Sequence, residues 1–260
     1  MTTSVGTARP RVGADDALVA EDVTVTFTGV KALDGVTFLC KPGEIVGLIG
    51  PNGSGKTTLL NTLSGFLEPA SGAVSFCGQP TRGWSPEHHA RRGLTRTFQG
   101  VRPFAQLTVR ENIEVGAIGV GASRRDARRR ASELLEELGL TDLAATWAGI
   151  LPAGSQRRLG IARALAAEPR FLLLDEPAAG LREAETDAVI DFIGGIGEKR
   201  GIGITLVEHD MRVVMRLCER VHVLDNGVTL AEGTPNEIRT NERVLEAYLG
   251  TGRAFRARGS

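Results

Sequence analysis

Cysteine is scarce in this sequence: the chain of 260 residues contains three cysteines, Cys40, Cys77 and Cys218. They are odd in number and widely separated, and no two of them form a Cys-x-x-Cys pair. This pattern indicates neither a disulfide framework nor a zinc site. We therefore interpret all three as buried small apolar residues.

The chain also lacks an excess of charge and lacks long apolar runs. Its 31 basic and 31 acidic residues give a formal net charge of +0, so no overall field attracts DNA or RNA, and we expect no nucleic-acid partner. No apolar run approaches the length of about 18 residues that a membrane helix needs, so a membrane role would require a partner. Residues 1–17 lack the apolar core of a secretory signal and are predicted to form a mobile tail in the cytoplasm.

Apolar patterning predicts two kinds of sheet. Residues 18–27 and 32–40 show partial alternation and are separated by Thr28 and Gly29, which predicts an antiparallel hairpin. A further strand is expected at 72–77. Short apolar strands alternate with helical segments elsewhere, the strands at 44–49, 171–174, 202–207 and 221–224 and the helices at 56–63, 183–199 and 211–216. Strands joined by helices indicate a mostly parallel sheet, so we expect an α/β fold with an antiparallel β subdomain.

Between these parts, residues from about 108 to 167 contain no convincing strand. Leu134, Leu135 and Leu138 fall on one face of a predicted helix there, so we expect a helical subdomain inserted into the α/β core. Near the other end, Asp225-Asn226-Gly227 predicts a hairpin turn before a strand at 228–231, and a helix is expected at 241–249.

Glycine is abundant, with 33 residues, and it marks the most specific motif. Residues 50–57 read GPNGSGKT and fit G-x-x-x-x-G-K-[ST] between a predicted strand and a predicted helix. Glycines let backbone N–H groups converge on phosphate oxygens at the positive end of the helix. The alternative, a glycine turn before a surface lysine, does not require the flanking strand and helix. The predicted nucleotide-binding residues are Gly50, Asn52, Gly53, Ser54, Gly55, Lys56, Thr57 and Thr58.

Within this loop, Lys56 is expected to reach the β- and γ-phosphates, and the Thr57 hydroxyl to bind Mg²⁺. A second element supports this, because the predicted strand 171–174 ends in Asp175 and Glu176. Ligands bind at the carboxyl edge of parallel sheets. Asp175 is therefore expected to hold Mg²⁺, and Glu176 to orient or deprotonate the attacking water. Carboxylates at a strand end are otherwise often turn residues.

A third element, His209, follows the predicted strand 202–207, which is a candidate neighbour of the Asp175 strand. His209 is therefore expected to contact the γ-phosphate, or to fix the water and Glu176. The remaining histidines, His88, His89 and His222, have no comparable setting, and we interpret them as structural or solvent-facing.

Together these residues resemble the ATP-binding subunit of an ABC transporter, from about residue 18 to residue 250. The resemblance implies a P-loop ATPase core that uses ATP and Mg²⁺. It also implies that Phe27 stacks on adenine and that Gln99 links the Mg²⁺ site to the helical subdomain. A core phenylalanine and a solvent-exposed loop glutamine are the alternatives for these two residues. Residues 251–260 are then a C-terminal tail.

The segments GFLEPASG, RTFQGVRPFAQLTVREN, LLLDEPAAGL and VLEAYLG are similar to those of the branched-chain amino-acid importer subfamily. This resemblance implies a cytoplasmic ATPase at the inner face of the cell membrane. It would pair with a second ATPase subunit, commonly a different chain, and bind membrane permeases fed by an external solute-binding protein. Residues 102–107 and the helical insertion would meet the permease. The transported solute is not identified, because the ATPase subunit does not touch it.

One departure concerns the signature loop, which in the family reads Leu-Ser-Gly-Gly-Gln or has Tyr third. The corresponding residues here are Leu151, Pro152, Ala153, Gly154 and Ser155, followed by Gln156. The family's loop closes on the ATP of the opposite subunit, and Pro152 removes both a hydroxyl and an N–H. Gly154 still permits close backbone approach, and we expect Ser155 to cap the following helix and to donate to phosphate, so that part of the function survives. The departure favours an asymmetric pair with a different subunit.

Three other functions are consistent with parts of this pattern. The altered signature loop is compatible with a regulatory subunit that binds nucleotide but hydrolyses little, although Glu176 and His209 argue against it. A soluble ABC protein acting on ribosomes or DNA usually has two cassettes or long insertions. A P-loop kinase is disfavoured by the combination of Gln99, Asp175, Glu176 and His209.

Overall fold

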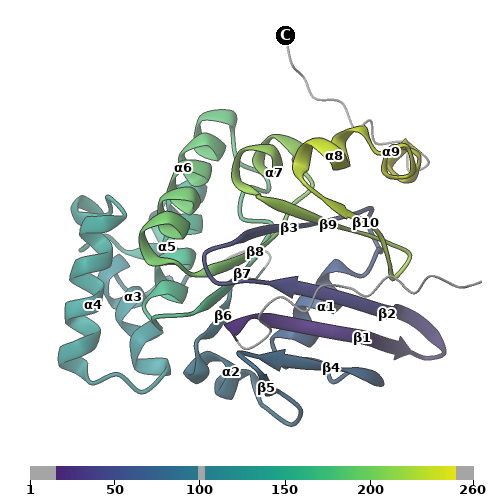
Figure 1. Cartoon of the computed structure of the whole chain (residues 1–260). Helices are drawn as coiled ribbons and strands as arrows, with labels where there is room; N and C mark the ends of the chain where they lie inside the picture. The colour runs from purple at the N-terminus through teal and green to yellow at the C-terminus, as the bar shows by residue number, and fades with distance from the viewer. Residues whose placement is uncertain (1–15, 99–102, 250–260) are drawn as a thin grey trace, which may run out of the picture.

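The computed structural model describes residues 16–98 and 103–249, which form two β-sheets and a group of helices (Figure 1). The strands are β1 (Leu18–Phe27), β2 (Val30–Cys40), β3 (Ile45–Ile49), β4 (Ser71–Phe76), β5 (Gln79–Pro80), β6 (Leu94–Arg96), β7 (Phe171–Asp175), β8 (Gly203–Val207), β9 (Arg220–Asp225) and β10 (Val228–Gly233). The α-helices are α1 (Lys56–Leu63), α2 (Pro86–Arg92), α3 (Val109–Gly119), α4 (Arg124–Glu137), α5 (Ala153–Leu165), α6 (Glu183–Arg200), α7 (Met211–Leu217), α8 (Pro235–Thr240) and α9 (Glu242–Leu249).

The larger sheet has the strand order β10-β9-β3-β8-β7-β6, and all of its pairs are parallel except β9 with β10. Every residue of β3, β7 and β8 is buried, as expected for apolar strands covered on both faces. Parallel pairing places the carboxyl ends of these three strands at one edge of the sheet. The predictions of a mostly parallel sheet and of adjacent Asp175 and His209 strands are confirmed.

The smaller sheet is antiparallel, in the order β2-β1-β4-β5, and includes the predicted hairpin of β1 and β2. Helix α1 lies in a core shared by the two sheets. Leu59 and Leu60 of α1 pack there with Phe38 of β2 and with Leu48 and Leu173 of the larger sheet. The antiparallel sheet thereby packs against α1, the helix that follows the loop 50–55.

The helices α3, α4 and α5 form the predicted insertion, at the side of the molecule where β6 and β7 lie (Figure 1). Two short 3-10 turns, at Thr141–Leu143 and Ala148–Ile150, connect α4 to α5. Thr108 begins α3 with a capping box that includes Glu111, and Leu134 and Leu135 of α4 are buried. The described residues contain no helix long and apolar enough to cross a membrane. The predicted tails, 1–17 and 251–260, lie outside the described residues except for Asp16 and the buried Ala17.

The interpretation of the cysteines is confirmed for Cys40 and Cys218 and is wrong for Cys77. Burial raises the pKa of the Cys40 and Cys218 thiols to about 12. Cys77 is only partly buried, because it lies in the turn between β4 and β5 with a φ of 50°. Of the three histidines interpreted as structural or solvent-facing, His89 and His222 are buried and His88 is exposed.

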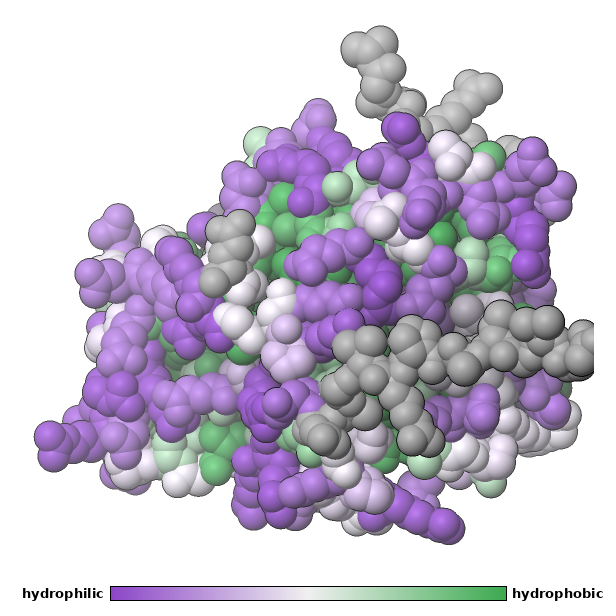
Figure 2. All heavy atoms as spheres, viewed as in Figure 1, coloured by the Kyte–Doolittle hydropathy of each residue, from purple (hydrophilic) through white to green (hydrophobic). Residues whose placement is uncertain are grey.

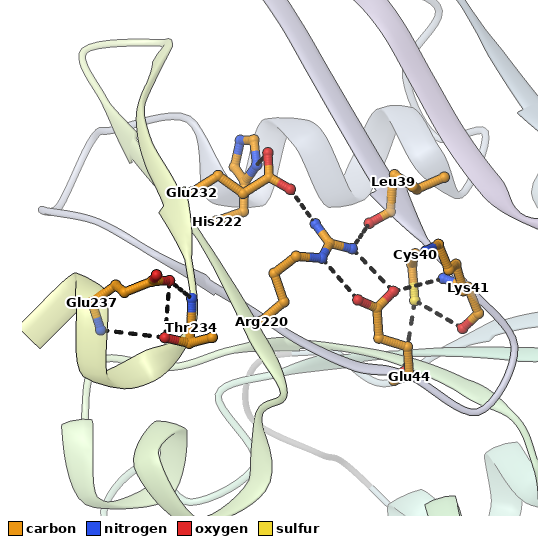
Figure 3. Close-up of polar contacts among 9 residues, drawn as sticks. All are labelled: Leu39, Cys40, Lys41, Glu44, Arg220, His222, Glu232, Thr234 and Glu237. Carbon is orange, nitrogen blue, oxygen red and sulfur yellow. Dashed lines mark hydrogen bonds and ion pairs between the residues drawn. The ribbon is translucent and has the colours of Figure 1, made fainter. Parts of the chain in front are cut away.

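Arg220 of β9 ties the two sheets together (Figure 3). Its guanidinium donates to the Glu44 carboxylate at 2.8 and 3.0 Å and to the Leu39 carbonyl at 2.7 Å, and it also pairs with Glu232 of β10. The adjacent His222 and the Arg220 charge lower the pKa of Glu232 to about 2. Beside this cluster, Thr234 and Glu237 form the capping box that begins α8.

Glu232 should contribute stability that depends on pH. Because the pKa of its carboxyl is lower in the fold than the usual 4.5, its contribution is complete above that value and is lost as the pH falls toward 2. After allowance for solvent screening, we expect Glu232→Gln to lower the free energy of unfolding by about 1 kcal/mol at pH 7. In urea denaturation this difference should shrink at pH 3.5. The exposed Glu21 provides the matched Glu→Gln control, and a difference that is constant with pH would contradict the prediction.

Candidate functional site

Residues 50–55 connect β3 to α1, and three glycines give this loop its shape. Gly50, Gly53 and Gly55 have φ values of 150°, 81° and 105°. A Cβ atom on Gly50 would lie 2.0 Å from the Leu224 carbonyl oxygen of β9, and one on Gly55 would lie 2.7 Å from the Ala32 carbonyl oxygen of β2. A Cβ on Gly53 would meet nothing within 4 Å. The loop is therefore packed against both sheets on one side and open at Gly53.

Lys56, the first residue of α1, folds its side chain back over this loop. Its Nζ donates to the carbonyl oxygens of Gly50 and Pro51, each at 2.8 Å, and contacts Ser54 Oγ at 3.4 Å. Burial lowers the pKa of the Lys56 amine, while the nearby Glu176 and Asp175 act in the opposite direction. The amine is thus held between the loop and the two carboxylates. The first amides of α1 add the positive end of a helix.

Asp175 is the last residue of β7, and its carboxylate forms a buried ion pair. Its Oδ2 lies 2.8 Å from an Nη atom of Arg96, and both side chains are 5% exposed. Arg96 ends β6, the parallel neighbour of β7. The sequence analysis did not predict β6 and assigned no role to Arg96. The only signal was a basic residue near the end of a short apolar segment.

Glu176 and His209 are brought together, as expected from the sequence. His209 Nδ1 lies 3.9 Å from Glu176 Oε1. Glu176 has a φ of 49°, and its N–H donates to the Val207 carbonyl at 3.0 Å, which holds the left-handed turn after β7 against the end of β8. A carboxylate and an imidazole therefore lie at the same sheet edge as Lys56.

Glu208 connects the two segments that carry these residues. It is 1% exposed, and burial raises the pKa of its carboxyl. Its carboxylate accepts the N–H of Ala178 at 2.9 Å and the N–H of His209 at 3.2 Å. The sequence analysis gave Glu208 no role. An acidic residue directly after an apolar strand was the available signal.

The remaining predicted site residues lie apart from this edge or outside the described residues. Phe27, at the end of β1, is 46% exposed, which rules out the alternative of a core phenylalanine. Gln99 and Arg102 lie outside the described residues. The signature-loop residues lie at the start of α5. There Pro152 is the N-terminal cap residue without a side-chain hydrogen bond, Gly154 is buried, and the Gln156 side chain donates to the Leu151 carbonyl at 2.9 Å.

The expectation that Ser155 caps this helix is wrong. Helix α5 begins at Ala153, so Ser155 lies inside its first turn, where its Oγ accepts a long 3.5 Å contact from Arg158. A capping side chain belongs to the residue that precedes the helix, and that position holds Pro152.

The residues at the sheet edge fit a magnesium nucleotide. Thr57 and Asp175 carry the hard oxygen donors that Mg²⁺ prefers. The described residues contain no group of three or more His, Cys, Asp or Glu side chains placed to hold a metal ion by themselves. Mg²⁺ usually binds through one or two protein ligands together with substrate phosphates. The open side of the loop at Gly53 leaves room for phosphate oxygens next to the backbone.

A cavity of about 700 Å³ lies between β6 with α2 on one side and the helices α3 and α5 of the insertion on the other, and we call it the groove. Phe66, Phe98 and Phe104 line it and are each about half exposed. The Arg163 guanidinium lies 5.2 Å from the Phe104 ring centroid, and burial lowers the pKa of Arg163. Figure 2 shows apolar residues on the visible face as separate areas among polar side chains.

Comparison with known proteins places these features in context. The family model described as ABC transporter matches residues 33–179, and the model described as branched-chain amino acid ATP-binding cassette transporter matches residues 228–254. The chain is 40% identical over 248 residues to the high-affinity branched-chain amino acid transport ATP-binding proteins BraF of Pseudomonas aeruginosa and LivG of Escherichia coli, covering 90% of this chain and 97% of each relative. The lipopolysaccharide export system ATP-binding protein LptB of Haemophilus influenzae is 33% identical with the same coverage.

Among solved structures, a nucleotide-free ATP-binding cassette from an ABC transporter is similar with a TM-score of 0.82 and 30% identity, covering 90% of this chain and 98% of that chain. The ADP conformation of an ATP-binding cassette is similar with a TM-score of 0.82 and 30% identity, at 90% and 99% coverage.

Proposed function

This chain belongs to the ABC transporter family of ATP-binding proteins, and on that premise we propose that it binds and hydrolyses ATP to drive the uptake of branched-chain amino acids through partner permeases. The observation that carries the proposal is the single sheet edge where Lys56, Asp175, Glu176 and His209 meet. The match of residues 228–254 to the branched-chain subfamily supports the choice of substrate class.

The phosphate chain of ATP would lie along the loop 50–55. Lys56 would move its amine from the Gly50 and Pro51 carbonyls to the phosphate oxygens, an exchange of one set of oxygen acceptors for another. The backbone N–H groups of the loop and of the first turn of α1, which includes Thr57 and Thr58, would bind the same oxygens. The half-exposed ring of Phe27 is available to stack on the adenine.

Glu176 and His209 would act on the attacking water and on the terminal phosphate. A carboxylate close to the loop can orient the water and accept its proton. His209 lies close enough to Glu176 to orient that carboxylate and can donate a hydrogen bond to the phosphate. Glu208 acts through His209 and Ala178 as a positioning residue, because it binds the backbone N–H group of each.

Thr57 and Asp175 would hold Mg²⁺, together with the predicted contribution of Gln99. When bound, the ion supplies positive charge against the β- and γ-phosphate oxygens. In the structure the Asp175 carboxylate is paired with the Arg96 guanidinium.

The groove is the proposed docking surface for the permease, at the inner face of the membrane. Its aromatic lining is half exposed, which is the property of a surface that a partner covers. The groove is lined by residues of the α/β core and of the helical insertion, so a helix of the permease seated there would contact both parts. This assigns to the groove the role that the sequence analysis gave to residues 102–107 and the helical insertion.

The second ATPase subunit is proposed to be a different chain. At the start of α5, Pro152 offers no hydroxyl and no backbone N–H to a phosphate on the opposite subunit, and Ser155 is held within the helix. A partner with an intact signature loop would complete the site built on Lys56, and the opposite site would be impaired. The same loop is the observation that favours the second candidate, a regulatory subunit that binds nucleotide with little hydrolysis.

The nucleotide site is tested by measuring ATP binding and hydrolysis in parallel. Lys56→Ala should weaken ATP binding by about tenfold to a hundredfold, because a charge-assisted contact to phosphate is lost. Glu176→Gln should retain binding and lower the hydrolysis rate by at least about a hundredfold. Lys199→Ala, at an exposed lysine of α6, is the matched control. Binding by Lys56→Ala equal to that of the unmodified chain would contradict the assignment of the site.

The asymmetric pair is tested by restoring the signature loop. In a Glu176→Gln background, which preserves bound ATP, we expect the chain to remain a monomer with MgATP. Adding Pro152→Ser and Ser155→Gln should produce an ATP-dependent dimer, detected by size-exclusion chromatography with light scattering. Pro235→Ser, at the start of α8, is the control. A stable dimer formed by the Glu176→Gln chain without the restored residues would show that the altered loop supports self-pairing.

Docking in the groove is tested by placing a charge in its lining. Phe104→Glu should abolish co-purification with the permease subunits from detergent-solubilised membranes, while ATP binding by the isolated chain stays within about twofold. The exposed Ile150, which does not line the groove, provides the control Ile150→Glu. Permease binding that survives Phe104→Glu would exclude the groove as the docking surface.

A further inference from the structure

Arg96 makes two buried contacts at the sheet edge, and each joins it to a different element. One Nη atom lies 2.8 Å from Asp175 Oδ2 on β7, and the other donates to Asn61 Oδ1 on α1. Helix α1 is the helix that begins with Lys56. Arg96 therefore links α1, the helix that follows the loop 50–55, to Asp175, the carboxylate proposed to bind the metal.

The same guanidinium forms part of the groove wall. Its Cζ lies 5.0 Å from the ring centroid of Phe98, and the Phe98 ring meets Phe66 edge to face at 5.5 Å. Both rings line the groove together with Arg96. Arg96 Nε is buried, and no hydrogen-bond partner for it exists among the residues that the structure describes. Arg96 thus has contacts with Asn61 and Phe98 that do not depend on Asp175.

The Asp175 carboxylate is paired with the Arg96 guanidinium and is also the proposed ligand of Mg²⁺. The Arg96 side chain and the Asp175 side chain are each 5% exposed, so water screens their attraction weakly. A guanidinium at hydrogen-bond distance stabilises the ionised carboxylate and, by the same attraction, competes with any second cation that needs its oxygens. A doubly charged metal ion would also be repelled by the nearby guanidinium.

Resting on the proposed function, we propose that Arg96 is the counter-ion of Asp175 until the metal nucleotide binds. Mg²⁺ would then displace the Arg96 guanidinium from the Asp175 carboxylate. In the absence of the metal, Arg96 compensates the charge of the Asp175 carboxylate. A guanidinium released from Asp175 would still have Asn61 and the Phe98 ring as partners. Arg96 is a positioning residue that sets the Mg²⁺ concentration at which the site fills.

This role also connects the groove with the metal site. A partner that seats in the groove against Phe98 contacts the ring on which the Arg96 guanidinium lies. The metal-binding carboxylate and the proposed docking surface thereby share one arginine.

The test is a Mg²⁺ titration of the full chain in the presence of a fluorescent ATP analogue. Arg96→Gln removes the competing charge, so the Mg²⁺ concentration that gives half of the Mg²⁺-dependent binding should fall by about tenfold. Arg96→Lys keeps the charge and should stay within about twofold of the unmodified chain. Arg220→Gln, which breaks the partly buried pair with Glu44 at the amino-terminal end of β9, is the matched control and should leave this concentration unchanged. Without nucleotide, Arg96→Gln and Arg220→Gln should both lower the unfolding temperature.

An Arg96→Gln variant that needs the same Mg²⁺ concentration as the unmodified chain, or a higher one, overturns the proposal. Should that variant fail to fold, NMR of the arginine Nε–H groups in the unmodified chain gives the answer, with Arg96→Lys used for assignment. The Arg96 signal should shift when Mg²⁺ is added to the ADP-bound chain, and an unchanged signal overturns the proposal. Absence of nucleotide binding by the unmodified chain would instead contradict the proposed function itself.

Discussion

The parallel pairing of β3 with β8 and of β8 with β7 is the constraint on which the rest of the structure depends. These strands are buried at every residue, so their order and register are set by packing on both faces of the sheet. Parallel strands end at the same edge. Three segments therefore meet at that edge: the loop 50–55, Asp175 and Glu176 at the end of β7, and residues 208–209. More than a hundred residues of chain separate the loop from the other two segments.

The phosphate loop takes its shape from contacts distant in the sequence. Gly50 fits because its backbone lies against the Leu224 carbonyl of β9, and Gly55 because it lies against Ala32 of β2. The antiparallel sheet is therefore part of the support of the loop, in addition to presenting Phe27. Arg220 joins β9 to Glu44 and to Leu39 of β2 and thereby links the two sheets.

The three carboxylates of the site differ in the groups that compensate their charge. Asp175 is paired with Arg96, Glu208 is occupied by two backbone N–H groups, and Glu176 lies beside His209. Of the three, Glu176 remains the carboxylate best placed to act on a water molecule, because its side chain is 22% exposed while Asp175 is 5% exposed. The helical insertion adds the groove on the other side of Arg96, so the proposed docking surface and the proposed metal site lie on neighbouring residues.

The sequence by itself determined the local elements that have strong patterns: the glycine loop before Lys56, the apolar strand that ends in Asp175, and the insertion without strands. These follow from residue type and spacing along the chain. It did not reveal β6, which has three residues, or α2 and α8, which each bury a single residue and so carry no apolar periodicity.

Only the tertiary structure decided which side chains compensate one another. The pairing of Arg96 with Asp175 and the position of Glu208 between Ala178 and His209 both depend on strands that are distant in sequence lying side by side. The start of α5 at Ala153 likewise left Ser155 inside the helix, because a helix boundary is set by backbone geometry and packing as well as by capping preference. The local sequence pattern specifies whether a segment forms a helix or a strand, and the strand order of the sheet specifies which residues that segment contacts.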